Sequence, residues 1–66
     1  MSNEKQDKKF QKALEYMDKN GKITNDDYQK LNRVSDATAS RDLRKLVNMG
    51  VVQKIGSGKK TYYKLK

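Results

Sequence analysis

The sequence predicts an α+β fold in which three helices are followed by a C-terminal β-hairpin. Apolar residues recur at helical spacing in three stretches between residues 7 and 49, and polar or glycine-containing turns separate them. Beyond residue 50, valine, isoleucine, threonine and tyrosine stand on either side of the turn sequence GSGKK. Because these residue types favour strands, the last region is typical of a hairpin.

The first helix is predicted from apolar residues spaced three or four positions apart. These residues are Phe10, Ala13, Leu14 and Met17. They form one stripe of an amphipathic helix, and Gly21 is suited to the left-handed conformation that follows a helix C-terminus. The polar residues 1–6 are expected to form a flexible tail, and residues 7–66 a single domain.

The second helix begins at a capping signal. Thr24 can cap the helix, and Asp27 stands three residues later, where a capping-box acid belongs. Tyr28 and Leu31 are expected to face inward. Ile23, just before the cap, could pack back on this helix or form a short strand near residues 22–24.

The third helix is predicted over about residues 36–49, with Ser35 as its N-cap and Gly50 beyond its end. A turn of about four residues joins it to the second helix, and this spacing is that of a helix-turn-helix unit. Its buried face is expected to carry Ala39, Leu43, Leu46 and Val47. Asp42 lies at the edge of that face, where it could pair with a lysine from elsewhere.

The opposite face of the third helix carries cations and no carboxylate. It consists of Ala37, Arg41, Arg44, Lys45 and Asn48, with Thr38 and Ser40 flanking it. Ordinary solvated helix faces mix both charge signs, because acid–base pairs four residues apart stabilise a helix. Arginine, asparagine and hydroxyl residues are those used by helices that read the major groove of DNA. We interpret this face, together with the capping Ser35 at the start of the helix, as a surface that contacts DNA; the alternative is a surface helix that happens to be basic.

The hairpin is predicted to have strands near residues 51–55 and 61–65 and a loop near 56–60. Tyr63, with Leu65 and Val52, is expected to face the core. Polar side chains along the hairpin and at its tip are candidates for contacts with DNA: Lys54, Ser57, Lys59 and Lys60. Lysines also protect edge strands against aggregation, and both roles can hold at once.

The positive charge is concentrated in the second half of the chain. Residues 1–35 hold eight Lys/Arg against six Asp/Glu, a net +2, whereas residues 36–66 hold eight against two, a net +6. This asymmetry favours a polyanionic partner, with nucleic acid first and an anionic membrane surface second. No apolar run approaches the length of a membrane span.

Catalysis is the weakest of the function classes. The chain has no cysteine and no histidine, so it lacks the usual general base, thiol nucleophile and commonest metal ligand. The adjacent Asp26 and Asp27 are explained by helix capping. We therefore predict a protein that is not an enzyme, with no cofactor, metal ion or small-molecule ligand.

The order of these elements resembles the winged helix-turn-helix of bacterial and phage transcription regulators. Residues 21–66, GKITNDDYQKLNRVSDATASRDLRKLVNMGVVQKIGSGKKTYYKLK, are similar to the winged-helix modules of DeoR- and MarR-like regulators. They look closest to the module that ends many RecG-like regulators and Fic-type proteins. The resemblance places the recognition face and the wing tip on these residues: Thr38, Ser40, Arg41, Arg44, Lys45, Lys59 and Lys60.

The leading functional expectation is a sequence-specific protein that binds double-stranded DNA and regulates transcription. Its third helix would enter the major groove, and the hairpin wing would touch the backbone or minor groove. One module covers only a few base pairs, so useful specificity favours a homodimer, with pairing through the first helix at Tyr16 or another residue off its apolar stripe. The alternative is a winged helix that binds an acidic protein surface. A cytoplasmic location, in a bacterial, archaeal or phage-infected cell, is the expectation for either.

Overall fold

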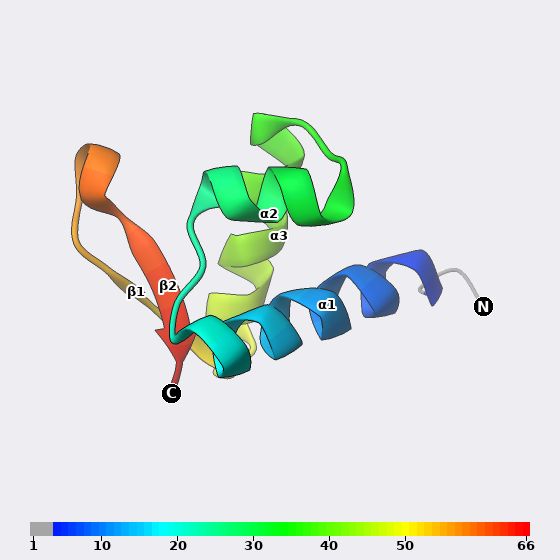
Figure 1. Ribbon diagram of the computed structural model, residues 1–66, viewed down its shortest axis with the longest axis horizontal. Helices are drawn as coiled ribbons and strands as arrows, with labels where there is room; N and C mark the ends of the chain where they lie inside the picture. Colours follow the sequence, from blue (N-terminus) through cyan, green and yellow to red (C-terminus); the bar gives the residue numbers. More distant parts are fainter. Residues whose placement is uncertain (1–3) are drawn as a thin grey trace.

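A computed structural model of the protein describes residues 4–66. Three helices precede an antiparallel hairpin, which confirms the predicted α+β winged-helix arrangement (Figure 1). The elements are α1 (Glu4–Asn20), α2 (Asn25–Asn32), α3 (Asp36–Asn48), β1 (Val52–Ile55), the 3-10 turn η1 (Gly58–Lys60) and β2 (Tyr62–Leu65). In the view of Figure 1, α1 extends to one side, α2 lies across α3, and the hairpin stands at the other side.

The start of α1 differs from the sequence expectation. The helix begins at Glu4, so residues 4–6, which were expected to belong to a flexible tail, are helical. Glutamate, lysine and glutamine are good helix formers, and their intrinsic preference extends the helix beyond its apolar stripe. Residues 1–3 of the expected tail lie outside the residues that the structure describes.

The capping box before α2 is confirmed. The backbone N–H of Asp27 donates to Thr24 Oγ1 at 3.1 Å, and the backbone N–H of Thr24 donates to Asp27 Oδ2 at 3.1 Å. The helix ends at Asn32 and is followed by the C-cap residue Arg33, which adopts a left-handed conformation with φ 54° and ψ 51°. This conformation turns the chain sharply, so α3 can begin at Asp36 after Ser35 has capped it.

The hairpin and the segment before α2 are joined by backbone hydrogen bonds. In the hairpin, Val52 pairs with Leu65 and Lys54 with Tyr63. The N–H of Ile23 donates to the carbonyl of Tyr63 at 2.8 Å, and the N–H of Tyr63 donates to the carbonyl of Ile23 at 2.8 Å. At the place where a short strand was one of two possibilities, near residues 22–24, the structure has an isolated β-bridge of one residue, and β2 lies between this residue and β1.

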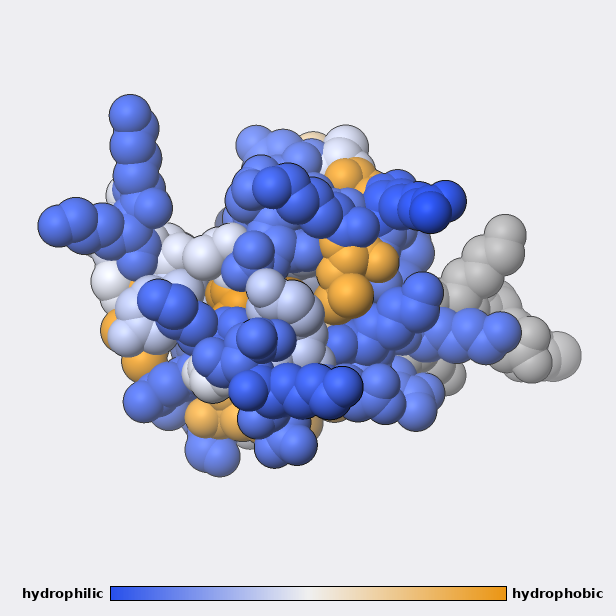
Figure 2. Space-filling model, viewed as in Figure 1, coloured by the Kyte–Doolittle hydropathy of each residue, from blue (hydrophilic) through white to orange (hydrophobic). Residues whose placement is uncertain are grey.

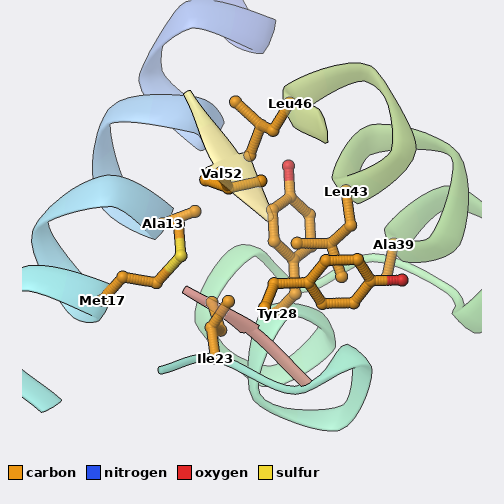
Figure 3. Packing of buried hydrophobic residues seen from close by; sticks show 9 residues of the cluster. Ala13, Met17, Ile23, Tyr28, Ala39, Leu43, Leu46 and Val52 are labelled. Atoms are coloured by element: carbon orange, nitrogen blue, oxygen red, sulfur yellow. The ribbon is translucent and has the colours of Figure 1, made fainter. Parts of the chain in front are cut away.

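One core is assembled from all three helices, the hairpin and Ile23 (Figure 3). Its buried apolar residues are Ala13, Met17, Ile23, Tyr28, Ala39, Leu43, Leu46, Val52 and Tyr63. Three of the four residues expected on the buried face of α3 are fully enclosed, and Val47 is half-buried. The expectation that Leu65 faces the core is wrong, because this side chain lies 36% exposed at the open end of the hairpin.

Hydrophilic side chains cover most of the face seen in Figure 2, and hydrophobic surface shows only in small patches, one of them between α2 and α1. Among residues 4–66, no helix is long and apolar enough to cross a membrane.

Candidate nucleic-acid interface

The cations of α3 lie on its exposed face. Arg41, Arg44 and Lys45 are all exposed, while Leu43 and Leu46 on the other side of the helix are buried. In the part of the chain that the structure describes, the one ion pair joins Lys30 to Asp26 at 3.2 Å. The three cations of α3 therefore have no carboxylate partner there, and their charge is available to an external anion.

The position of Asp42 in the sequence suggested a place at the edge of the buried face of α3, but in the structure this residue is buried. Its side chain is only 4% exposed, and Tyr28 of α2 donates a hydrogen bond to Asp42 Oδ2 at 2.9 Å. The expected pairing with a lysine is therefore wrong. Burial, the hydrogen bond to Asp42 and the negative charge of that carboxylate together raise the pKa of Tyr28. This contact fixes α2 against the middle of α3.

Asn25 makes a second connection between α2 and α3. Its Nδ2 group donates to Ser40 Oγ at 2.8 Å and, over a longer distance of 3.4 Å, to the backbone carbonyl of Asp36. Asn25 is in turn held by Gln29 of the next helical turn, whose Nε2 group donates to Asn25 Oδ1 at 2.6 Å. The start of α2 is thus connected to the N-terminal part of α3 through the side-chain amide of Asn25.

The hydroxyl residues at the start of α3 have different environments. Ser35 is the N-cap: its Oγ accepts from the backbone N–H of Thr38 at 3.2 Å and donates to Thr38 Oγ1 at 3.1 Å. Thr38 is half-buried, whereas Ser40 is exposed. Ser35 and Thr38 are therefore occupied with each other, and Ser40 is the hydroxyl that α3 presents most openly.

The wing carries exposed lysines at its tip. Lys59 and Lys60 lie in η1, directly after Ser57, and all three are exposed. The turn depends on Gly56, which has φ +82° and lies so close to the backbone that an added Cβ would stand 2.8 Å from the carbonyl oxygen of Lys60. Glycine therefore holds the tip in the conformation that presents these cations.

A narrow groove lies between α3 and the hairpin. It has a volume of about 190 Å³, and its lining residues are Ser40, Arg44, Val47, Lys54 and Tyr63. Lys54 is the cross-strand partner of Tyr63, so the two side chains share one face of the hairpin. Burial raises the pKa of Tyr63, and the positive charge of Arg44 acts against this shift. The groove thus brings a cation from α3 and one from β1 to the same place.

A wider cleft of about 630 Å³ continues this groove towards the wing tip. Lys54 and Lys59 line it on the hairpin side, while Asp26 and Asp36 line it on the helix side. An anion held in the cleft would be attracted to the hairpin side and repelled from the other side. The sequence did not indicate this cleft, because residues from α2, α3 and the wing meet there only in the folded chain.

Eleven of the twelve predicted site residues are exposed, and Thr38 is the exception. Ser40, Arg44 and Lys54 share the groove, and Lys59 joins Ser40 and Lys54 in the wider cleft. The remaining predicted residues lie outside both concave sites: Ser35, Ala37, Thr38, Arg41, Lys45, Asn48, Ser57 and Lys60. The spacing of the residues did not single out Asn25 or Gln29, because polar residues are common near the start of any exposed helix.

Three or more potential metal ligands of the types His, Cys, Asp and Glu do not come together anywhere in the described residues. The concave sites are lined mainly by hydroxyls, amides, amines and the guanidinium of Arg44, with two carboxylates in the wider cleft, which suits an extended anion better than a coordinated cation. The arrangement of groups is therefore one for binding, and its charge favours a polyanion.

Comparison with known protein families agrees with this assignment. A search of curated proteins gave no match. Residues 5–66 match a family described as "Transcriptional regulator DIP2311-like, C-terminal domain". This family is not one of those that the sequence resemblance named, so the likeness to DeoR-, MarR- and RecG-like proteins stays a prediction. Because the match covers nearly the whole chain, and because a helix-turn-helix with a hairpin wing suits regulators of transcription, the protein belongs to the family of DIP2311-like transcriptional regulator C-terminal domains.

Proposed function

We propose that this protein is a sequence-specific double-stranded DNA-binding module of a transcription regulator. The observation that carries the proposal is the exposed face of α3, where Arg41, Arg44 and Lys45 have no carboxylate partner within the described chain. In this proposal α3 enters the major groove, and the wing lies against the backbone or the adjacent minor groove. The fold and the family description are consistent with such a role.

The chemistry of the exposed residues suggests how the work is divided. Arginine can form two parallel hydrogen bonds with a guanine edge, and Asn48 can do the same with adenine, so these residues are the candidates for base reading. Lys54, Lys59 and Lys60 are point charges suited to phosphate oxygens. Ala37 has a small side chain near the start of α3 and would allow the helix to approach the base edges closely. The function is binding, without a catalytic step.

The proposal is tested by titrating the protein into fluorescently labelled duplex DNA and recording anisotropy at several salt concentrations. Each phosphate contact by Lys or Arg should contribute about −0.9 to the slope of log K against log salt, so roughly six contacts predict a slope near −5. Selection of bound sequences from a random duplex pool would then give the preferred site. If no duplex is bound even at low salt, the alternative function as a protein-interaction module takes precedence.

We also propose that two copies pair through α1 on adjacent half-sites. Tyr16 is half-buried and lies beside Leu31, Lys12 and Glu15 in a shallow depression of about 510 Å³. A depression with both charge signs is suited to a self-complementary contact, in which each copy offers the same patch. Sedimentation equilibrium of the wild type and of Tyr16→Ala, with and without the selected duplex, tests this pairing. A protein that stays monomeric on a palindromic site would exclude it.

A further inference from the structure

The side chains of Gln29, Asn25 and Ser40 form a chain of hydrogen bonds with a defined direction. The amide of Gln29 donates to Asn25 at 2.6 Å, and the amide of Asn25 donates to Ser40 Oγ at 2.8 Å. Asn25 and Ser40 therefore each accept a hydrogen bond from the preceding group, and Asn25 donates to the next one. The last donor in the chain is the hydroxyl hydrogen of Ser40.

This last donor has no acceptor of its own in the described protein. A serine inside a helix often donates back to the carbonyl four residues earlier, which here is that of Asp36. That carbonyl instead receives the second, longer contact from Asn25 at 3.4 Å. Ser35 differs, because its hydroxyl donates to Thr38 Oγ1. The exposed Ser40 hydroxyl is thus free to donate to a group outside the protein.

Ser40 also stands where an external acceptor would be bound. It lines both the narrow groove and the wider cleft, next to Arg44 in the first and to Lys59 in the second, with Lys54 in both. Asp26 and Asp36 also line the wider cleft, whereas the lining of the narrow groove has two cations and no carboxylate. On the groove side of Ser40, the cations around this free donor therefore attract groups that are negative and accept hydrogen bonds. Phosphate oxygens and the acceptor atoms of base edges both meet this description.

From this geometry we infer that Asn25, backed by Gln29, is a positioning residue for DNA recognition: it occupies an acceptor site of Ser40 and directs the Ser40 hydroxyl outward as a donor. The inference rests on the proposed DNA-binding function. In this role Asn25 of α2 does not contact DNA itself and affects binding only by orienting the Ser40 hydroxyl. The expected ligand atom is a hydrogen-bond acceptor of the duplex, from either a phosphate or a base edge.

A double-mutant cycle on the full chain tests the inference. We expect Ser40→Ala to weaken binding to the selected duplex by about five- to tenfold, as the loss of one hydrogen bond predicts. Asn25→Ala should weaken it by about threefold, because the hydroxyl is then free to turn elsewhere. If Asn25 acts through Ser40, Asn25→Ala should have no further effect in the Ser40→Ala background.

Asn32→Ala is the matched control for loss of an amide from α2. The Asn32 amide donates to the backbone carbonyl of Lys9 in α1 at 3.3 Å, so its hydrogen bond joins α2 to α1 and not to Ser40. Asn32→Ala should therefore change thermal stability about as much as Asn25→Ala and leave DNA affinity unchanged. Asn25→Asp removes the donor and offers only acceptors, so Ser40 should turn inward and binding should fall at least as far as with Ser40→Ala.

Two duplexes of equal length, the selected one and an unrelated one, distinguish the source of the acceptor. An equal loss on both, after Ser40→Ala, identifies a phosphate oxygen, whereas a loss confined to the selected duplex identifies a base edge. Independent, multiplying effects of the two substitutions, or wild-type affinity of Asn25→Ala, would overturn the inference while leaving the proposed function intact. If the wild type binds neither duplex, the proposed function fails, and the inference fails with it.

Discussion

Tyr28 and Asp42 are a polar pair inside a small apolar core. Tyr28 is fully buried, Asp42 is 4% exposed, and the hydroxyl of the first donates to the carboxylate of the second. A helical wheel gives the angle of Asp42 on α3 but cannot say which residue of another helix covers that angle. For this reason the sequence suggested a lysine partner, and the structure has a tyrosine instead.

We expect Tyr28→Phe to lower the free energy of unfolding by about 1–3 kcal/mol, because it leaves the Asp42 carboxylate buried without this donor. Tyr62→Phe is the control, since Tyr62 is half-buried and lies near Lys22 outside the core. Combining Tyr28→Phe with Asp42→Leu should restore most of the loss, because both polar groups are then removed. Urea denaturation measures all four proteins. A double variant less stable than Tyr28→Phe would contradict this account.

The same pair predicts a loss of stability at alkaline pH. The pKa of Tyr28 in the folded protein is raised above its ordinary value of 10.0 by burial and by Asp42. The unfolded chain therefore releases the tyrosine proton first, so the stabilisation is complete below about pH 10 and declines as the pH rises above it. Denaturation curves between about pH 8 and 11 should show a steeper decline for the wild type than for Tyr28→Phe. Parallel declines would argue against the pair as the cause.

Arg41 and Arg44 are exposed on the face of α3 opposite its buried residues, so their removal should not disturb the fold. We expect Arg41→Ala with Arg44→Ala to abolish the preference for the selected duplex and to reduce the salt slope by about 0.9 for each lost phosphate contact. Lys8→Ala with Lys30→Ala removes the same charge from α1 and α2 and is the control. Anisotropy titrations compare the two proteins. Equal losses in both would mean that net charge, and not α3, governs binding.

At the scale of elements, the wing is the part most dependent on single residues. Gly56→Ala places a Cβ 2.8 Å from the Lys60 carbonyl oxygen, whereas Gly58→Ala meets nothing within 4 Å, although both glycines have positive φ. Gly56→Ala should therefore displace the wing tip and weaken DNA binding several-fold, and Gly58→Ala should change affinity little. NMR chemical shifts of residues 56–61 would locate the change. Equal effects of both substitutions would show that φ, and not the close contact, determines the turn.

The helices could be predicted well because local signals mark their ends. Thr24 with Asp27, Ser35, Gly21 and Gly50 act within one turn of the positions that they define. In the structure α2 begins directly after Thr24, and α3 has nearly the predicted bounds. The exposure of Leu65 could not be predicted in the same way. Strand alternation places Leu65 on the same face as Tyr63, but only the three-dimensional packing shows that the core ends before the last residue of β2.

The candidate site was predicted in its charge and not in its shape. The exposure of Arg41, Arg44 and Lys45 follows from their angle to the buried leucines, which the sequence contains. The groove between α3 and the hairpin depends on how β1 and β2 pack against the helix, and Lys54 enters it through its pairing with Tyr63. The role of Asn25 depends on a contact with Ser40, fifteen positions further along the chain.

At the scale of the whole molecule, the stability rests on one small core. Leu46 is 1% exposed and sits among residues contributed by all three helices and the hairpin. Leu46→Ala should cost about 2–5 kcal/mol, which is a large share of the stability of so small a domain. Lys45→Ala, the neighbouring exposed position, should cost little. Thermal unfolding followed by circular dichroism compares them, and an unchanged melting temperature for Leu46→Ala would contradict the described core.

The backbone bridge between Ile23 and Tyr63 ties the wing to the segment that leads into α2. The amide protons of these two residues can exchange with solvent only when the hairpin and that segment separate. They should therefore be among the slowest to exchange and should do so at a common rate. Because of these two hydrogen bonds, the wing cannot move independently of the segment before α2. A duplex that displaces the wing tip therefore also displaces the segment that leads into the helix-turn-helix.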